Sequence, residues 1–161
     1  MQRDLTRVAH WLQPEEILID VQLRDSGHAL QVIADAISAR HGLDPGPVFR
    51  ALSRREQAGS TALGGGFAIP HARISGIERP LTLLLRAQHG IPFKAPDTDP
   101  VSLILAILVP EEGDKDDHLQ LLALVAELFS KPQFRAQLDT GADTAAIAAA
   151  FRTGVSQLRG N

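Results

Sequence analysis

The chain has 161 residues and a mass of 17.3 kDa, enough for one domain with a sizeable core. It contains no cysteine, which excludes disulfide frameworks and thiol catalysis. Sixteen Lys and Arg against nineteen Asp and Glu give a net charge of −3, and aromatic residues are few, so nucleic acid is disfavoured as a partner.

In the first third of the chain, the sequence pattern predicts one helix, then one strand, then two more helices. Apolar residues at helical spacing predict a weakly amphipathic helix over 4–12, and period-two alternation predicts a strand over 17–23. Capping residues then delimit two helices, the first from Asp25 to Gly42 and the second from Asp44 to about Gly59. Residues 59–71 show no periodicity.

The remainder predicts two strands, over 81–87 and 101–109, followed by helices. The second strand is continuously apolar, which is typical of a central strand covered on both faces. A helix follows over 116–129, and further helices open at 130–132 and 143–144. In the helix over 116–129, the residues expected to face inward are Leu119, Leu122, Val125 and Ala126. Helices mixed with four or five strands indicate an α/β fold.

Neither export nor membrane insertion is expected. The N-terminus lacks an apolar stretch behind its charges, and the longest apolar run, 101–109, is far shorter than the ~20 residues of a spanning helix. The sequence therefore predicts a cytoplasmic protein.

A glycine-rich loop, residues 64–66, is the first candidate for chemistry. Consecutive glycines permit positive φ and a close approach of backbone to a ligand. The loop lacks the Gly-Lys-Ser/Thr ending of a Walker A motif, and Ile69 stands where a dinucleotide fingerprint needs its third glycine. A turn without a ligand is an equally good interpretation of the glycines alone.

His71 is the second candidate, because it directly follows Pro70 and the glycine loop. A neutral imidazole can act as a nucleophile or exchange a proton near pH 7. With six histidines in the chain, a surface histidine in a loop remains a strong alternative.

Two further residues carry weaker signals. His118 falls in the first turn of a predicted helix, where backbone amides favour an anion. Arg55 precedes the glycine loop, and its guanidinium suits phosphate oxygens. The alternatives are an ordinary first-turn residue for His118 and a solvated face for Arg55. No ligand spacing supports a metal site.

Together these residues form a pattern. The run from Arg55 to His71, REQAGSTALGGGFAIPH, resembles the signature of the enzyme IIA family of the fructose/mannitol and nitrogen-regulatory phosphotransferase systems. Residues 91–110 and 118–126 resemble the family's next two blocks, in family order. The sequence departs from the family at Gly65, where Asn or Glu is frequent, and at Ala72, where Gly is frequent.

The resemblance implies one domain over residues 1–161, with a core from about 5 to 152, built on a mixed sheet of about five strands flanked by helices on both faces. It implies that His71 is phosphorylated, on Nε2, by a histidine carrier of the HPr type. His118 and Arg55 would support the transfer, with no metal and no cofactor. The implied phosphoryl-binding loop consists of Ser60, Thr61, Gly64, Gly65 and Gly66.

Three functions follow as hypotheses. The first is a regulator of the nitrogen-regulatory type, whose binding to target proteins changes with phosphorylation; it would not turn over a small molecule of its own. The second is a sugar-transport IIA that passes the phosphoryl group to a cognate IIB protein. The third, from another class, is an anion-binding module without transfer activity.

Overall fold

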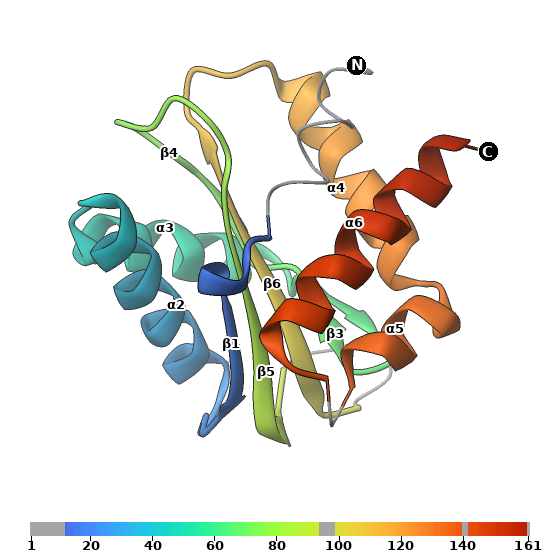
Figure 1. Ribbon diagram of the computed structural model, residues 1–161. Coiled ribbons are helices and arrows are strands. Elements are labelled where there is room, and N and C mark those ends of the chain that lie inside the picture. Colours follow the sequence, from blue (N-terminus) through green and yellow to red (C-terminus); the bar gives the residue numbers. More distant parts are fainter. Residues whose placement is uncertain (1–11, 94–98, 140–141, 161) are drawn as a thin grey trace. The chain divides into compact units, whose positions relative to one another are not determined.

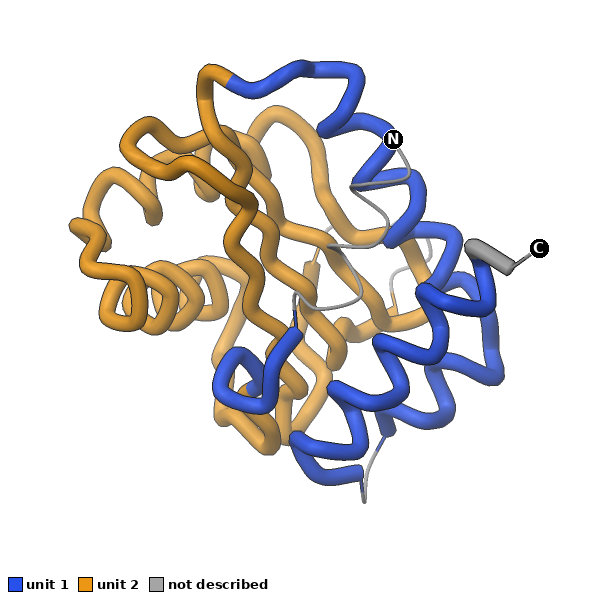
Figure 2. Tube along the Cα trace, turned by 45° about the horizontal axis from the view of Figure 1, so that its top comes forward, with its two compact units in different colours: residues 1–17, 113–161 blue, residues 18–112 orange. Residues whose placement is uncertain are grey.

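The computed structural model describes residues 12–93, 99–139 and 142–160. The chain divides into two compact units, residues 18–112 and residues 1–17 with 113–161 (Figure 2). Each unit is described by itself below. The predicted helix over 4–12 lies outside the described residues, apart from its last residue, and so does the stretch 94–98 of the second resembling block.

Unit 2, residues 18–112, is built on a mixed sheet (Figure 1). Among the described residues the sheet has six strands, and its path is β1-β5-β6-β3-β2, with β4 also pairing with β6. The strand β5 runs antiparallel to β6, whereas β3 and β4 run parallel to it. The strands are β1 (Ile17–Val21), β2 (Ala62–Gly64), β3 (Phe67–Ala68), β4 (His71–Ile74), β5 (Leu81–Ile91) and β6 (Val101–Pro110).

Two helices of this unit, α2 (Ser26–His41) and α3 (Pro45–Ala58), begin and end where their caps predict. The Asp25 carboxylate accepts the His28 backbone N–H, and Gly42 ends α2 with a φ of 69°. Asp44 caps α3 in the same way, with Pro45 at its first position. Their apolar faces join one core with alternate residues of β5 and β6.

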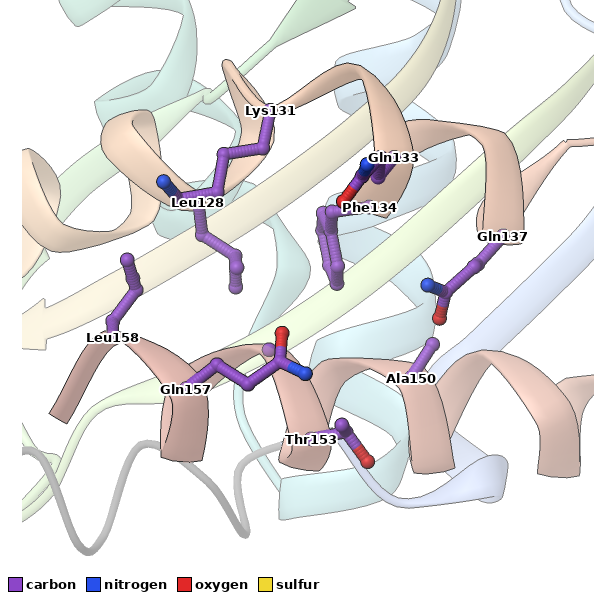
Figure 3. Close-up of a pocket in the computed structure, with 10 residues that line it drawn as sticks. Leu128, Lys131, Gln133, Phe134, Gln137, Ala150, Thr153, Gln157 and Leu158 are labelled. Atoms are coloured by element: carbon purple, nitrogen blue, oxygen red, sulfur yellow. The ribbon is translucent and has the colours of Figure 1, made fainter. Parts of the chain in front are cut away.

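The other unit contains the short 3₁₀ helix η1 (Pro14–Glu16) and the helices α4 (Lys115–Phe129), α5 (Pro132–Leu138) and α6 (Thr144–Gly160). The rings of Phe129 and Phe134 meet edge to face, with centroids 5.0 Å apart. A cavity of about 260 Å³ lies between α5 and α6, with Lys131 and three glutamines among its lining side chains (Figure 3).

Most element predictions are confirmed, including the mixed α/β sheet, but three details differ. The described residues form six strands rather than about five, and three of them, β2, β3 and β4, lie outside the strand ranges predicted from the sequence, because residues 59–71 lack periodicity and β4 has only four residues. Leu119 does not face inward, since it is 64% exposed, and Leu121 is buried instead. The strand β5 extends to Ile91, four residues beyond its predicted end. The predicted domain extent, residues 1–161, stays a prediction.

Candidate functional site

His71 is the first residue of β4, in register with Ile107 of the central strand β6. The Ile107 backbone N–H donates to the carbonyl of Pro70 at 2.9 Å, which fixes the backbone directly before His71. The imidazole is partly buried, and its Nδ1 lies 2.8 Å from the carbonyl oxygen of Ile69. A carbonyl only accepts, so the neutral ring carries its proton on Nδ1 and keeps the lone pair on Nε2.

The surroundings lower the pKa of His71 below its ordinary value of 6.5. Burial is the largest cause, because it penalises the charged ring. The bond to Ile69 opposes that effect, the positive charge of Arg55 adds to it, and the negative charge of Glu56 opposes it. These surroundings favour the neutral form of the ring, which has a lone pair available for bond formation.

Arg55 lies in the last turn of α3, where its Nη1 donates to the carbonyl of Gly59 at 2.6 Å. Its charge acts on the imidazole of His71, so the structure brings these two predicted site residues into one electrostatic environment. A guanidinium has five N–H donors, so the bond to Gly59 leaves donors for an oxyanion near the ring.

Glu56 was not among the predicted site residues. Its Oε1 accepts the Thr61 hydroxyl at 2.6 Å, and its Oε2 accepts the Thr61 backbone N–H at 3.0 Å. On the sequence Glu56 belongs to a short charge run with Arg54 and Arg55, which indicates a solvated helix face. The sequence feature that could have identified Glu56 as a site residue is its position within the run from Arg55 to His71, five residues before Thr61.

Ser60 and Thr61 make different hydrogen bonds. The Ser60 Oγ accepts the backbone N–H of Ala62 at 3.1 Å, so its own hydroxyl proton can still be donated elsewhere. The Thr61 hydroxyl proton is instead directed at the Glu56 carboxylate. Thr61 is also buried, with 4% of its surface exposed.

A continuous path of hydrogen bonds links α3 to the imidazole. Glu56 holds Thr61, and the Thr61 carbonyl accepts the backbone N–H of Ile69 at 3.0 Å. The carbonyl of the same Ile69 then accepts the Nδ1–H of His71. The segment 59–61 is thereby tied to the orientation of the ring.

The three glycines lie elsewhere on the hairpin. Gly64, Gly65 and Gly66 have φ values of 88°, 65° and 84°; Gly64 ends β2, and Gly65 and Gly66 form the turn that leads into β3. The Gly66 carbonyl accepts the backbone N–H groups of Ser102 and Leu103. Phe67, which follows the turn, pairs with Leu103 of β6, whereas His71 pairs with Ile107. These two positions on β6 are four residues apart, or ~13 Å along the strand at about 3.3 Å per residue. The structure does not place the glycine turn beside the imidazole.

His118 is the fourth residue of α4, in the other unit. The His118 backbone N–H donates to the carbonyl of Asp114, and the Asp114 carboxylate caps the helix by accepting the Asp116 backbone N–H. The His118 ring is partly buried. The first-turn position predicted from the sequence is confirmed. Its supporting role beside His71 stays a prediction.

Other arrangements carry little chemistry. A hollow of about 510 Å³ in unit 2 is lined by His28 and His89, but the Nδ1 of His28 already accepts the Arg24 backbone N–H. Among the described residues, no group of three or more His, Cys, Asp or Glu side chains is arranged to hold a metal ion. None of the described helices is both long enough and apolar enough to span a membrane.

Comparison with known proteins finds a family match over most of the chain. Residues 10–153 match the family described as "Phosphoenolpyruvate-dependent sugar phosphotransferase system, EIIA 2". Proteins named nitrogen regulatory protein from Bradyrhizobium diazoefficiens and Pseudomonas aeruginosa are 35% and 33% identical over 134 and 135 residues, which are 83% of this chain and 87% of each relative. The crystal structure of nitrogen regulatory protein IIA-Ntr from Neisseria meningitidis superposes with a TM-score of 0.84 at 31% identity, covering 90% of this chain and 99% of that one.

Proposed function

We propose that this chain, which belongs to the EIIA 2 family of the phosphoenolpyruvate-dependent sugar phosphotransferase system, accepts a phosphoryl group on Nε2 of His71. One observation carries the proposal. The Nδ1–H of His71 is directed at the Ile69 carbonyl, so a neutral ring holds its nucleophilic lone pair on Nε2. The donor in this proposal is a histidine carrier of the HPr type.

The bonds, electron pairs and protons of the proposed transfer are all accounted for by the two histidines, without a cofactor. The Nε2 lone pair attacks the phosphorus in line with the donor nitrogen, an N–P bond forms at His71, and the donor N–P bond breaks. The electron pair of the broken bond returns to the donor ring. His71 keeps its proton on Nδ1, and the Ile69 carbonyl stabilises the positive charge that develops on the ring.

The charge on the transferred oxygens calls for fixed donors close to Nε2. Arg55 supplies a cation, and its guanidinium is already held by the Gly59 carbonyl. Ser60 supplies a hydroxyl proton that its bond to Ala62 does not use. His118 is assigned a supporting role on the family resemblance alone. Gly64, Gly65 and Gly66 are left out because their turn lies away from His71 along β6.

The output of the phosphorylated protein is proposed to be regulatory. Two relatives that are 35% and 33% identical to this chain are named nitrogen regulatory protein, and each is matched over 87% of its own length. A phosphoryl group adds a charge of about −1.5 to −2 at a single point. A partner protein that contacts His71 would therefore bind the two forms differently.

Incubation with phosphoenolpyruvate, enzyme I and an HPr-type carrier tests the acceptor. We expect intact mass to show one acid-labile phosphoryl group on the native chain and none on His71→Ala, while His89→Ala, which changes an exposed histidine, is labelled normally. Uptake by His71→Ala would refute the acceptor, and no uptake by the native chain would favour an anion-binding module.

A second measurement separates regulation from sugar transport. The phosphorylated protein is mixed with sugar-specific IIB proteins, and onward transfer is followed by mass. We expect no productive transfer, and we expect partner capture that differs between phosphorylated and unphosphorylated forms. Rapid transfer to one IIB protein would favour the transport function instead.

A further inference from the structure

We propose that Glu56 is a positioning residue for phosphoryl transfer, acting through Thr61 and Ile69 to hold the imidazole of His71 with Nε2 as its acceptor nitrogen. The inference rests on the proposed function, because it concerns how the acceptor nitrogen is presented. It assigns a role to a side chain that reaches His71 only through other residues.

The first step is the contact between Glu56 and Thr61. Both oxygens of one carboxylate accept hydrogen bonds from one residue, the hydroxyl at 2.6 Å and the backbone N–H at 3.0 Å. Hydrogen bonds to an ionised acceptor are about twice as strong as neutral ones. Thr61 is buried, so the loss of this carboxylate would leave two donors shielded from water.

The second step carries this restraint across the hairpin. Thr61 faces Ile69, and its carbonyl accepts the Ile69 backbone N–H at 3.0 Å. The Thr61 backbone is thus held on one side by α3 and on the other by the segment that leads to His71. A shift of Thr61 would move the Ile69 peptide with it.

The third step reaches the ring. The Ile69 carbonyl is the acceptor for the Nδ1–H of His71 at 2.8 Å, and this bond determines which ring nitrogen keeps the lone pair. Outer-shell partners that orient metal-binding histidines change metal affinity or activity by roughly 10–100-fold when they are mutated, and we expect an effect at the lower end of that range for the tautomer of His71. The Glu56 charge also raises the pKa of His71, in opposition to burial and to Arg55.

The same contacts separate the roles of two adjacent hydroxyls. The Thr61 hydroxyl donates its single proton to Glu56, so it cannot donate to a phosphoryl oxygen at the same time. Ser60 keeps its proton available. Thr61 therefore belongs to the positioning path, and Ser60 belongs to the proposed phosphoryl site.

The test is Glu56→Gln, read by the ring ¹⁵N chemical shifts of His71 and by the phosphorylation rate. We expect the share of the Nδ1–H tautomer to fall and the rate to drop by roughly tenfold. The matched control is Glu78→Gln, which removes an exposed carboxylate from the same unit and is expected to change neither. A role confined to stability would leave the ring shifts of the folded protein unchanged.

A second pair of variants keeps the test decisive if Glu56→Gln fails to fold. Thr61→Ser retains both donors and is expected to match the native chain, whereas Thr61→Val removes only the hydroxyl donor and is expected to lower the rate and shift the tautomer. If Glu56→Gln or Thr61→Val has the same His71 tautomer and the same phosphorylation rate as the native chain, the inference is overturned. If the native chain takes up no phosphoryl group while the variants still shift the tautomer, the proposed function fails and the positioning path stands.

Discussion

The two ends of the β2–β3 hairpin differ in sequence and in what they contribute to the site. At the open end, Thr61 faces Ile69, and side chains from α3 join the backbone to His71. At the closed end, Gly65 and Gly66 form a two-residue turn with positive φ, and the Gly66 carbonyl is bonded to the backbone of β6. The open end carries the polar side chains of the site, whereas the closed end supplies backbone shape.

This difference shows that a glycine-rich signature need not be a ligand cradle. Both central residues of the turn require positive φ, which glycine adopts without steric cost. The turn lies at the register of Leu103 on β6, whereas the imidazole lies at the register of Ile107. Variants at the open end should therefore change phosphoryl transfer, and variants at the closed end should change stability.

The largest effect short of removing His71 is expected for Arg55→Gln. The change removes a positive charge that acts on the imidazole, so the phosphorylation rate should fall by about 100–1,000-fold and the pKa of His71 should rise. The control is Arg54→Gln, which deletes the same charge from the exposed neighbour on the same helix. Stopped-flow transfer kinetics and an NMR titration measure the two quantities. Equal behaviour of the two variants would refute a specific role for Arg55.

The second prediction concerns pH. Protonation occupies the Nε2 lone pair, so the phosphorylation rate should fall as the pH drops through the pKa of His71, with a midpoint below 6.5. The unfolded chain binds this proton more readily than the native one, so the contribution of His71 to stability is present above pH 6.5 and is lost as the pH falls below it.

Rate profiles across this pH range, together with urea unfolding of the native chain and His71→Gln, provide the measurement. The variant should lose less stability on acidification than the native chain. A rate midpoint above 6.5 would mean that the charge of Glu56, rather than burial, dominates the site.

The smallest effect on transfer is expected at the closed end, for Gly65→Ala. A side chain at a φ of 65° costs ~1–2 kcal/mol, so the free energy of unfolding should fall by about that amount. The phosphorylation rate should stay unchanged. The control for the free energy of unfolding alone is Gly59→Ala, where the backbone is extended with a φ of 162° and an added Cβ meets nothing within 4 Å, so no loss of stability is expected. Slower transfer by Gly65→Ala at unchanged stability would return the glycines to the phosphoryl site.

Local chemistry made much of the fold predictable. Asp25, Gly42 and Asp44 delimit α2 and α3 because capping depends on residues adjacent in sequence. The strands β2, β3 and β4 lie outside the predicted ranges because segments of three, two and four residues are too short to show a period. Leu119 was predicted to face inward because helical spacing does not decide which of several apolar residues is buried.

The site was predictable in part for a related reason. His71 and Arg55 stand out through residue type and the family resemblance, and the structure brings them into one electrostatic environment. Glu56 was missed because its contact with Thr61 arises only when the chain turns after α3. The glycines were assigned to the phosphoryl site because they are near His71 in sequence, but an extended segment carries the chain away from them.

The position of the phosphoryl group on the ring tests the central claim most directly. A long-range ¹H–¹⁵N spectrum of the phosphorylated protein identifies which histidine nitrogen is bonded to phosphorus. The open-end contacts predict a single phosphorylated nitrogen, Nε2 of His71, with Nδ1 still protonated and bonded to the Ile69 carbonyl. Phosphorus on Nδ1 of His71, or on any other residue, would contradict the account.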